Sequence, residues 1–131
     1  MRVFCIVHSA IALVFGVALY MLFREGTYLH DILLPGRTLF ADACFIGSSF
    51  LRYYFPDFLW AYSLFFALGT ILVPSGKEWG LPALFTLGLG ILWEWLQYHG
   101  LMRGTGDAVD ILLYGAAIAV AEILVWRKKQ C

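Results

Sequence analysis

The stretch that decides the fold covers residues 81–97 and reads LPALFTLGLGILWEWLQ. Its apolar residues continue for nearly the length that a helix needs to cross the hydrocarbon core of a bilayer. Glu94 interrupts the run about one helical turn, or roughly 4–5 Å, before its end. A carboxylate at such a depth costs about 3 kcal/mol on insertion scales. We therefore predict a membrane-spanning helix in which Glu94 belongs to a functional site.

The composition assigns the chain to the membrane proteins. Of its 131 residues 62% are hydrophobic and only 14% are charged, and a soluble domain of this length has too little interior to bury so much apolar surface. The formal net charge is zero, so we expect no nucleic-acid partner. The three cysteines have neither paired nor metal-ligand spacing, which favours free thiols.

Three further apolar runs make the chain a single all-α domain, a polytopic bundle of four transmembrane helices. Pro56 and Pro82 stand near the starts of two runs, where proline is tolerated because the first helical N–H groups have no partner. The basic triplet Arg127-Lys128-Lys129 stops the last run. The predicted spans are residues 3–23, 57–73, 81–97 and 109–126.

The long connection between the first two spans contains a second apolar segment, Thr38 to Leu51. It carries Asp42 and follows Pro35-Gly36-Arg37, so we expect it to lie on the membrane interface or to enter the membrane as a re-entrant segment. If it crossed the membrane instead, the first span would be reversed, while the other three spans would keep their relation to one another.

Basic residues near the span ends set the expected orientation. With both termini in the cytoplasm, the inner side holds Arg2, Lys77 and the triplet Arg127-Lys128-Lys129. Four arginines remain outside, so the excess is small, and the compact C-terminal triplet decides the prediction. We expect both termini to be cytoplasmic.

Alternating span directions bring the polar ends of the last three spans to one membrane face. The second span begins at the outer face, the third ends there and the fourth begins there, which collects three acids from three helices. Residues three or four apart share a helix face, as Glu94 and Gln97 do. The candidate ligand-binding cluster is Arg52, Asp57, Glu94, Gln97, Arg103, Asp107 and Asp110.

Each of these residues also has a local structural interpretation. Asp57 favours the positive end of a helix dipole, and Asp107 with Asp110 has the pattern of an N-cap followed by a first-turn acid. Arg103 lies in a loop, where contact with water is enough to explain a charged side chain. Glu94 is hardest to explain in this way, although a structural ion pair with Arg52 or Arg103 is one alternative.

Two further features concern helix contacts. Small residues on the third and fourth spans favour a close approach of these two helices, which a short loop joins; they are Gly88, Gly90, Gly115, Ala116, Ala117, Ala119 and Ala121. Near the opposite membrane face, we expect structural roles for two polar residues: His8 forms a hydrogen bond with a neighbour, and Glu122 extends to the interface. A contact between His8 and Glu122 is one possibility.

Three motifs in order resemble the VanZ-like family of small bacterial membrane proteins. They are Pro56-Asp57-Phe58-Leu59-Trp60-Ala61-Tyr62, Glu94-Trp95-Leu96-Gln97 and the stretch from Gly104-Thr105-Gly106-Asp107 through Asp110 to Gly115. The resemblance covers about half of the chain, from Arg52 to Gly115. It implies a multi-pass protein of the bacterial cytoplasmic (inner) membrane with a role in the cell envelope. The founding member is associated with resistance to a glycopeptide antibiotic that binds a lipid-anchored cell-wall precursor. No reaction is implied for individual residues.

Three functions remain open for the cluster. In the first, Arg52 and Arg103 hold an anionic lipid headgroup or a lipid-linked envelope precursor while the acids fix the arginines. In the second, the chain is a membrane-embedded enzyme for a lipid-linked substrate, with carboxylates as metal ligands or as acid and base. In the third, it is a small structural subunit of a membrane complex. No cofactor is predicted, although carboxylates with Gln97 and His99 are suited to a divalent cation such as Mg²⁺ or Ca²⁺.

Overall fold

The computed structural model describes residues 1–23, 32, 48–73, 78–104 and 106–130. Within these residues every regular element is a helix: α1 Arg2–Phe23, α3 Ser48–Tyr53, α4 Phe55–Leu72, α5 Gly80–Tyr98 and α6 Ala108–Gln130. The prediction of an all-helical chain is confirmed. Most of the predicted segment Thr38 to Leu51 lies outside the described residues, and its last residues form part of α3.

Among the described residues, three helices are long and apolar enough to cross a membrane, namely α1, α4 and α6. The helix α5, which corresponds to the predicted span 81–97, has 19 residues and is not among the three, because Glu94 and Gln97 lower its mean hydropathy. The helix α6 continues through the basic triplet to Gln130, beyond the predicted span end at residue 126. Basic side chains interact favourably with the negative end of a helix dipole, so the triplet ends the apolar run without ending the helix.

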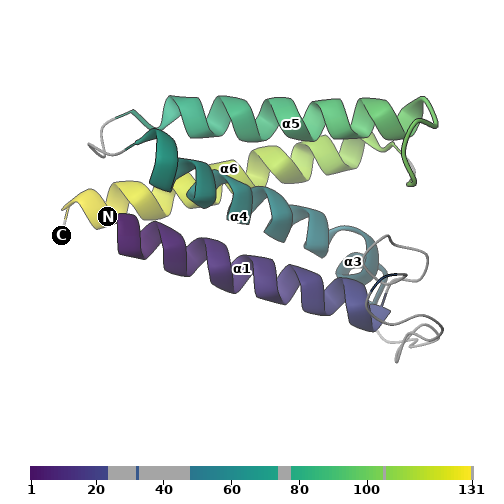
Figure 1. Cartoon of the computed structure of the whole chain (residues 1–131), viewed down its shortest axis with the longest axis horizontal. Coiled ribbons are helices and arrows are strands. Elements are labelled where there is room, and N and C mark those ends of the chain that lie inside the picture. Colours follow the sequence, from purple (N-terminus) through teal and green to yellow (C-terminus); the bar gives the residue numbers. More distant parts are fainter. Residues whose placement is uncertain (24–31, 33–47, 74–77, 105, 131) are drawn as a thin grey trace.

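The four long helices lie side by side along the long axis of the molecule, and both chain termini lie at the same end (Figure 1). The central helix is α4, which contacts α1, α5 and α6, while α5 also packs on α6. The short helix α3 packs against α4 and α1 at the end opposite the termini. Consecutive long helices therefore alternate in direction, as predicted for the last three spans.

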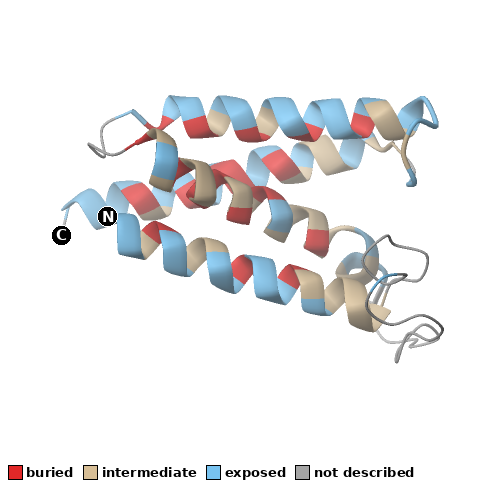
Figure 2. Cartoon of the chain, in the orientation of Figure 1, coloured by how far each residue is buried: buried red, intermediate tan, exposed pale blue. Residues whose placement is uncertain are grey.

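Burial follows the pattern expected when lipid replaces water around a bundle. Buried residues form narrow inward stripes, and exposed residues cover the outer faces of every long helix (Figure 2). The main core cluster includes Phe65 and Phe66 of α4, with Trp79 stacked on Phe65 at 5.5 Å between ring centroids. Many outward-facing residues are large and apolar. Because such residues gain nothing by leaving lipid, helix association depends on close packing and on hydrogen bonds.

The helix α5 enters the bundle through one stripe of every fourth residue: Pro82, Thr86, Gly90 and Glu94 are its buried positions. A Cβ atom at Gly90 would overlap the ring of Tyr114, so glycine allows α6 to approach here. The predicted close packing of these helices is correct for Gly90. It is wrong for Gly88 and Gly115, since no atom lies within 4 Å of a Cβ placed at either. Ala117 and Ala121 are buried on α6, whereas Ala116 and Ala119 are exposed.

Polar side chains join α1 to α4 within the bundle. His8 Nδ1 and the Tyr62 hydroxyl are 2.6 Å apart, and the Ser63 hydroxyl donates a hydrogen bond to the Ser9 carbonyl at 2.9 Å. The partner of His8 is thus Tyr62 of the neighbouring helix rather than Glu122. Hydrogen bonds of this kind fix the rotation of one apolar helix against another where hydrophobic burial gives no preference.

Candidate functional site

The predicted cluster residues lie at one end of the bundle, opposite the two termini. This end contains the last turns of α1 and α5, the short helix α3, and the first turns of α4 and α6 (Figure 1). Asp57 lies in the first turn of α4 and Asp110 in the first turn of α6. Glu94 and Gln97 lie in the last turns of α5, and Arg52 lies in α3. The expected meeting of acids from three helices at one end is therefore present.

Glu94 is the buried residue of this cluster, with only 5% of its surface exposed. The hydroxyl of Tyr114 donates a hydrogen bond to Glu94 Oε1 at 2.6 Å. The backbone N–H of Asp107 donates another to Glu94 Oε2 at 3.0 Å. Both donors belong to α6 or to the residue just before it, so the carboxylate joins the end of α5 to the start of α6. The alternative of a structural ion pair between Glu94 and an arginine is wrong, because the partners of Glu94 are these two donors.

Asp107 is the N-cap of α6. Its Oδ1 atom accepts a hydrogen bond from the backbone N–H of Val109 at 3.0 Å, which satisfies one of the N–H groups that have no partner within the helix. The capping interpretation of Asp107 is thereby confirmed. The two functions of this residue are separate, since its side chain caps α6 while its own N–H binds Glu94.

The turn between α5 and α6 is built on the last turns of α5. The Gln97 side chain donates a hydrogen bond from Nε2 to the Arg103 carbonyl at 3.1 Å. Gly104 has φ +133°, a backbone conformation that few residues other than glycine adopt. A Cβ atom at Gly106 would lie 2.6 Å from the carbonyl oxygen of Glu94, so only glycine fits at this position. Gln97 is therefore a positioning residue for the turn that carries Arg103.

Asp57 binds a residue of the first helix. Its Oδ1 atom accepts a hydrogen bond from the Tyr20 hydroxyl at 2.9 Å, and its position in the first turn of α4 also favours the helix dipole. Asp110 lies one helical turn before Tyr114 on α6, and the ring of Trp60, three residues after Asp57 on α4, lies 6.1 Å from the ring of Tyr114. Four helices thus contribute to one polar cluster at this end of the bundle.

The two arginines of the cluster differ in environment. Arg52 is half-buried on α3, and its Nε atom is shielded from solvent. Its guanidinium lies 5.9 Å from the centroid of the Tyr53 ring, in the range of cation–π contacts. Arg103 is exposed in the turn after α5. Arg52 is therefore partly packed against the bundle, while Arg103 is exposed at the same end.

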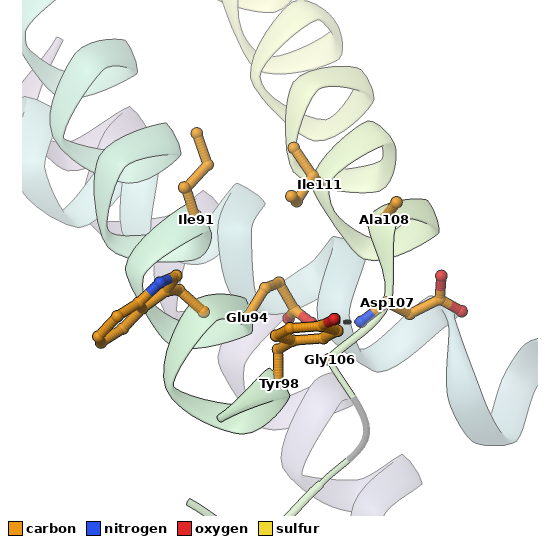
Figure 3. A pocket seen from close by; sticks show the side chains of 8 residues that line it. Ile91, Glu94, Tyr98, Gly106, Asp107, Ala108 and Ile111 are labelled. Atoms are coloured by element: carbon orange, nitrogen blue, oxygen red, sulfur yellow. Dashed lines mark hydrogen bonds between the residues drawn. The ribbon is translucent and has the colours of Figure 1, made fainter. Parts of the chain in front are cut away.

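A small pocket of about 240 Å³ opens beside Glu94, in the seam between α5 and α6. Figure 3 shows Ile91 on one wall and Ala108 and Ile111 on the other, with Glu94 between them. Trp95 and Tyr98 of α5 complete the first wall. Gly106 and Asp107 close the pocket on the side of the turn. Its lining is mostly apolar, although it lies next to the charged cluster.

The described part of the chain contains no group of three or more His, Cys, Asp or Glu side chains close enough to hold a metal ion. Asp107 uses one carboxylate oxygen for its cap and Glu94 uses both of its own in hydrogen bonds. His99 is exposed, with its ring 4.5 Å from that of Trp95. A divalent cation at this end of the bundle stays a prediction.

Two tyrosines that the sequence analysis did not include in the cluster bind its acids. Tyr114 lies on the helix face of Asp107 and Asp110, seven and four residues further along α6, so this spacing was a usable signal. Tyr20 lies near the end of α1 at the same end of the bundle. The one sequence feature that indicated a role for Tyr20 was its hydroxyl in the last turn of a largely apolar span.

Comparisons with protein-family models, with curated proteins and with solved structures each found no match to this chain. The resemblance to the VanZ-like family therefore stays a prediction from the three motifs.

Proposed function

We propose that this chain is a four-span protein of the bacterial cytoplasmic membrane that binds an anionic lipid or a lipid-linked envelope precursor at its charged end. In this proposal α5 crosses the membrane together with α1, α4 and α6, because it packs along α4 and α6 and alternates with them in direction. The charged end faces outward. The basic triplet at the end of α6 faces the cytoplasm, in keeping with the bias of basic residues toward that side.

The observation that carries the proposal is that Asp57, Glu94 and Asp110, from three helices, lie at the end of the bundle that also carries Arg52 and Arg103. Ionisable side chains within membrane helices are costly, so they mark functional sites more often than side chains of a soluble core do. Glu94 serves here to hold α5 and α6 together. The other acids and the two arginines are the groups assigned to the ligand.

Arginine suits a phosphate better than lysine does, because its planar guanidinium offers two parallel N–H donors to two oxygens. Arg52 supplies a guanidinium whose stem is packed against the bundle, which lowers the entropy lost when it binds. Arg103 approaches from the turn that Gln97 holds in place. In this proposal the carboxylates of Asp57 and Asp110 offset the two guanidinium charges when no lipid is bound. The motif resemblance to the VanZ-like family adds an envelope setting.

The test is the lipid that purifies with the protein. We expect mass spectrometry of the protein extracted in a mild detergent to show phosphatidylglycerol, or a lipid-linked precursor, enriched over its share of the membrane. The double variant Arg52→Gln with Arg103→Gln should lose this enrichment. The control, Arg127→Gln with Lys128→Gln, makes the same change in net charge at the opposite end and should retain it.

Three results would contradict the proposal or replace it. Equal loss in both double variants would show that the lipid is attracted by net charge alone. Absence of enrichment in the unaltered protein would refute binding. Conversion of the bound lipid on addition of Mg²⁺, stopped by EDTA, would establish the enzyme alternative instead.

The topology is tested separately. A Met102→Cys variant places a thiol in the exposed turn after α5 and should react with a membrane-impermeant reagent added to intact cells. Labelling of this thiol only after the cells are opened would reverse the proposed orientation.

A further inference from the structure

The pocket between α5 and α6 opens on the outer surface of the bundle. The residues of its α5 wall are exposed, with Ile91 at 45%, Trp95 at 52% and Tyr98 at 76%. The lining of the pocket comes from α5, the turn after it and α6, with no residue of α4. In a membrane-spanning bundle an opening on this surface faces the hydrocarbon chains of lipids.

The inner surface of the pocket carries two acids, Glu94 and Asp107. Both carboxylate oxygens of Glu94 already accept hydrogen bonds, from Tyr114 and from the Asp107 N–H. The Oδ1 atom of Asp107 accepts from Val109. Three of the four carboxylate oxygens are therefore already paired, which lowers the desolvation penalty that these acids impose on an apolar chain. The walls contribute dispersion contacts from one isoleucine on each side and from aromatic rings.

Groups of a different kind lie outside the lining of the pocket, in the turn that follows α5. The last turn of α5 leads into His99, whose ring contacts those of Trp95 and Tyr98. The turn continues to Arg103, whose carbonyl is fixed by Gln97. An occupant that meets both regions is apolar along one part and accepts hydrogen bonds from cationic or ring N–H groups at its end. A lipid chain that leads to a phosphate has this pattern, while a free phosphate has no use for the apolar walls.

The size of the pocket limits how much of the lipid it holds. About 240 Å³ is smaller than the pockets of about 300–1,000 Å³ that enclose whole drug-sized ligands. It suits a segment of a single hydrocarbon chain, with the remainder of the lipid in the bilayer.

We infer that the seam between α5 and α6 binds one hydrocarbon chain of the anionic lipid, next to the turn that carries Arg103. This inference rests on the proposed function and adds to it the position of the chain. The lipid is then held by two independent regions, its phosphate at the turn and its chain beside Glu94. Trp95 and Tyr98, which face the membrane on α5, become contact residues of the ligand.

The experiment uses the full chain in lipid nanodiscs of phosphatidylcholine that contain a small share of phosphatidylglycerol with a photoactivatable diazirine in one acyl chain. After illumination, peptide mass spectrometry locates the labelled residues. We expect labelling concentrated on residues 91–98 and 106–111, and suppressed by excess unlabelled phosphatidylglycerol. Ala108→Phe fills the pocket from α6 and should lose this labelling. Ala116→Phe makes the same change on an exposed position of α6 two turns away and should retain it.

Labelling spread evenly over the outer faces of the helices would overturn the inference, because it would show ordinary contact with the bilayer. Equal loss of labelling in both phenylalanine variants would overturn it as well. If Ala108→Phe does not fold, the map of the unaltered protein decides alone. Competition separates this outcome from failure of the proposed function. If phosphatidylglycerol but not phosphatidylcholine suppresses the labelling, and the label lies outside the seam, headgroup binding is retained and binding of the chain in the seam is rejected. If the label lies in the seam and both lipids suppress it equally, binding of the chain in the seam is retained and specific headgroup binding is rejected.

Discussion

The hydrogen bond between Tyr114 and Glu94 should be a measurable part of the stability of the bundle. Tyr114→Phe removes the hydroxyl that lies 2.6 Å from Glu94 Oε1 and leaves that oxygen buried. Glu94→Gln keeps the shape of the side chain but offers one acceptor where two donors converge, so either Tyr114 or the Asp107 N–H loses its bond. Each change leaves a buried polar group unpaired, which costs about 1–3 kcal/mol.

The double variant is expected to cost less than the sum of the two single variants. With phenylalanine at position 114, the glutamine carbonyl is available for the Asp107 N–H. We expect a coupling energy of about 1 kcal/mol, at the upper part of the range measured for hydrogen bonds between membrane helices. Equilibrium unfolding in mixed SDS and detergent micelles, followed by tryptophan fluorescence, gives the four free energies of unfolding that this cycle requires.

Tyr98→Phe is the matched control, because Tyr98 lies on α5 near the same end and is 76% exposed. Its combination with Glu94→Gln should be additive within about 0.5 kcal/mol, because Tyr98→Phe removes only an exposed hydroxyl and leaves the ring beside Glu94 in place. If the pair of Tyr114 and Glu94 were additive to the same precision, the carboxylate would not join α5 to α6 and our interpretation of Glu94 would be wrong.

Three further changes test the bundle by the same unfolding measurement. Gly90→Ala forces a Cβ atom into the Tyr114 ring and should lower the free energy of unfolding by about 1–3 kcal/mol. Gly88→Ala is the control, because its Cβ atom meets no atom within 4 Å, and it should cost nothing. Equal costs would contradict the packing of α5. Asp107→Ala removes the N-cap of α6 and should cost about 1 kcal/mol, while Asp107→Asn keeps an acceptor and should stay close to the unaltered protein. Tyr62→Phe breaks the contact with His8 and should cost about 0.6 kcal/mol, more than Tyr98→Phe does. Equal costs for the two variants would show that this contact does not stabilise the packing of α1 on α4.

The sequence was sufficient for the helices because their signals are local. The run of apolar residues fixes each length, and Pro56 and Pro82 mark two starts, so the expected start of each long helix lies within two residues of the observed one. The extension of α6 to Gln130 differs because a basic triplet stops an apolar run without stopping a helix. The convergence of Asp57, Glu94 and Asp110 followed from alternating directions alone.

The partners of these acids were not predictable, because they depend on how far each helix is rotated about its axis. Spacing along α5 places Glu94 and Gln97 on one face, but it does not state which neighbouring side chain that face meets. The partner proved to be Tyr114, admitted by the missing side chain of Gly90. In the same way, the bond from Tyr20 to Asp57 needs the relative rotation of α1 and α4. Gly88 and Gly115 were misplaced for the same reason, since both point away from their neighbours.

Binding of an anionic lipid at the charged end is tested most directly by locating the bound phosphate. The measurement is a cryo-electron microscopy map of the protein in nanodiscs containing phosphatidylglycerol, with an antibody fragment to aid alignment. We expect headgroup density within hydrogen-bond reach of Arg52 or Arg103, at the end of the bundle where Glu94 joins α5 to α6. Headgroup density confined to the opposite end, around Arg127, Lys128 and Lys129, would contradict this.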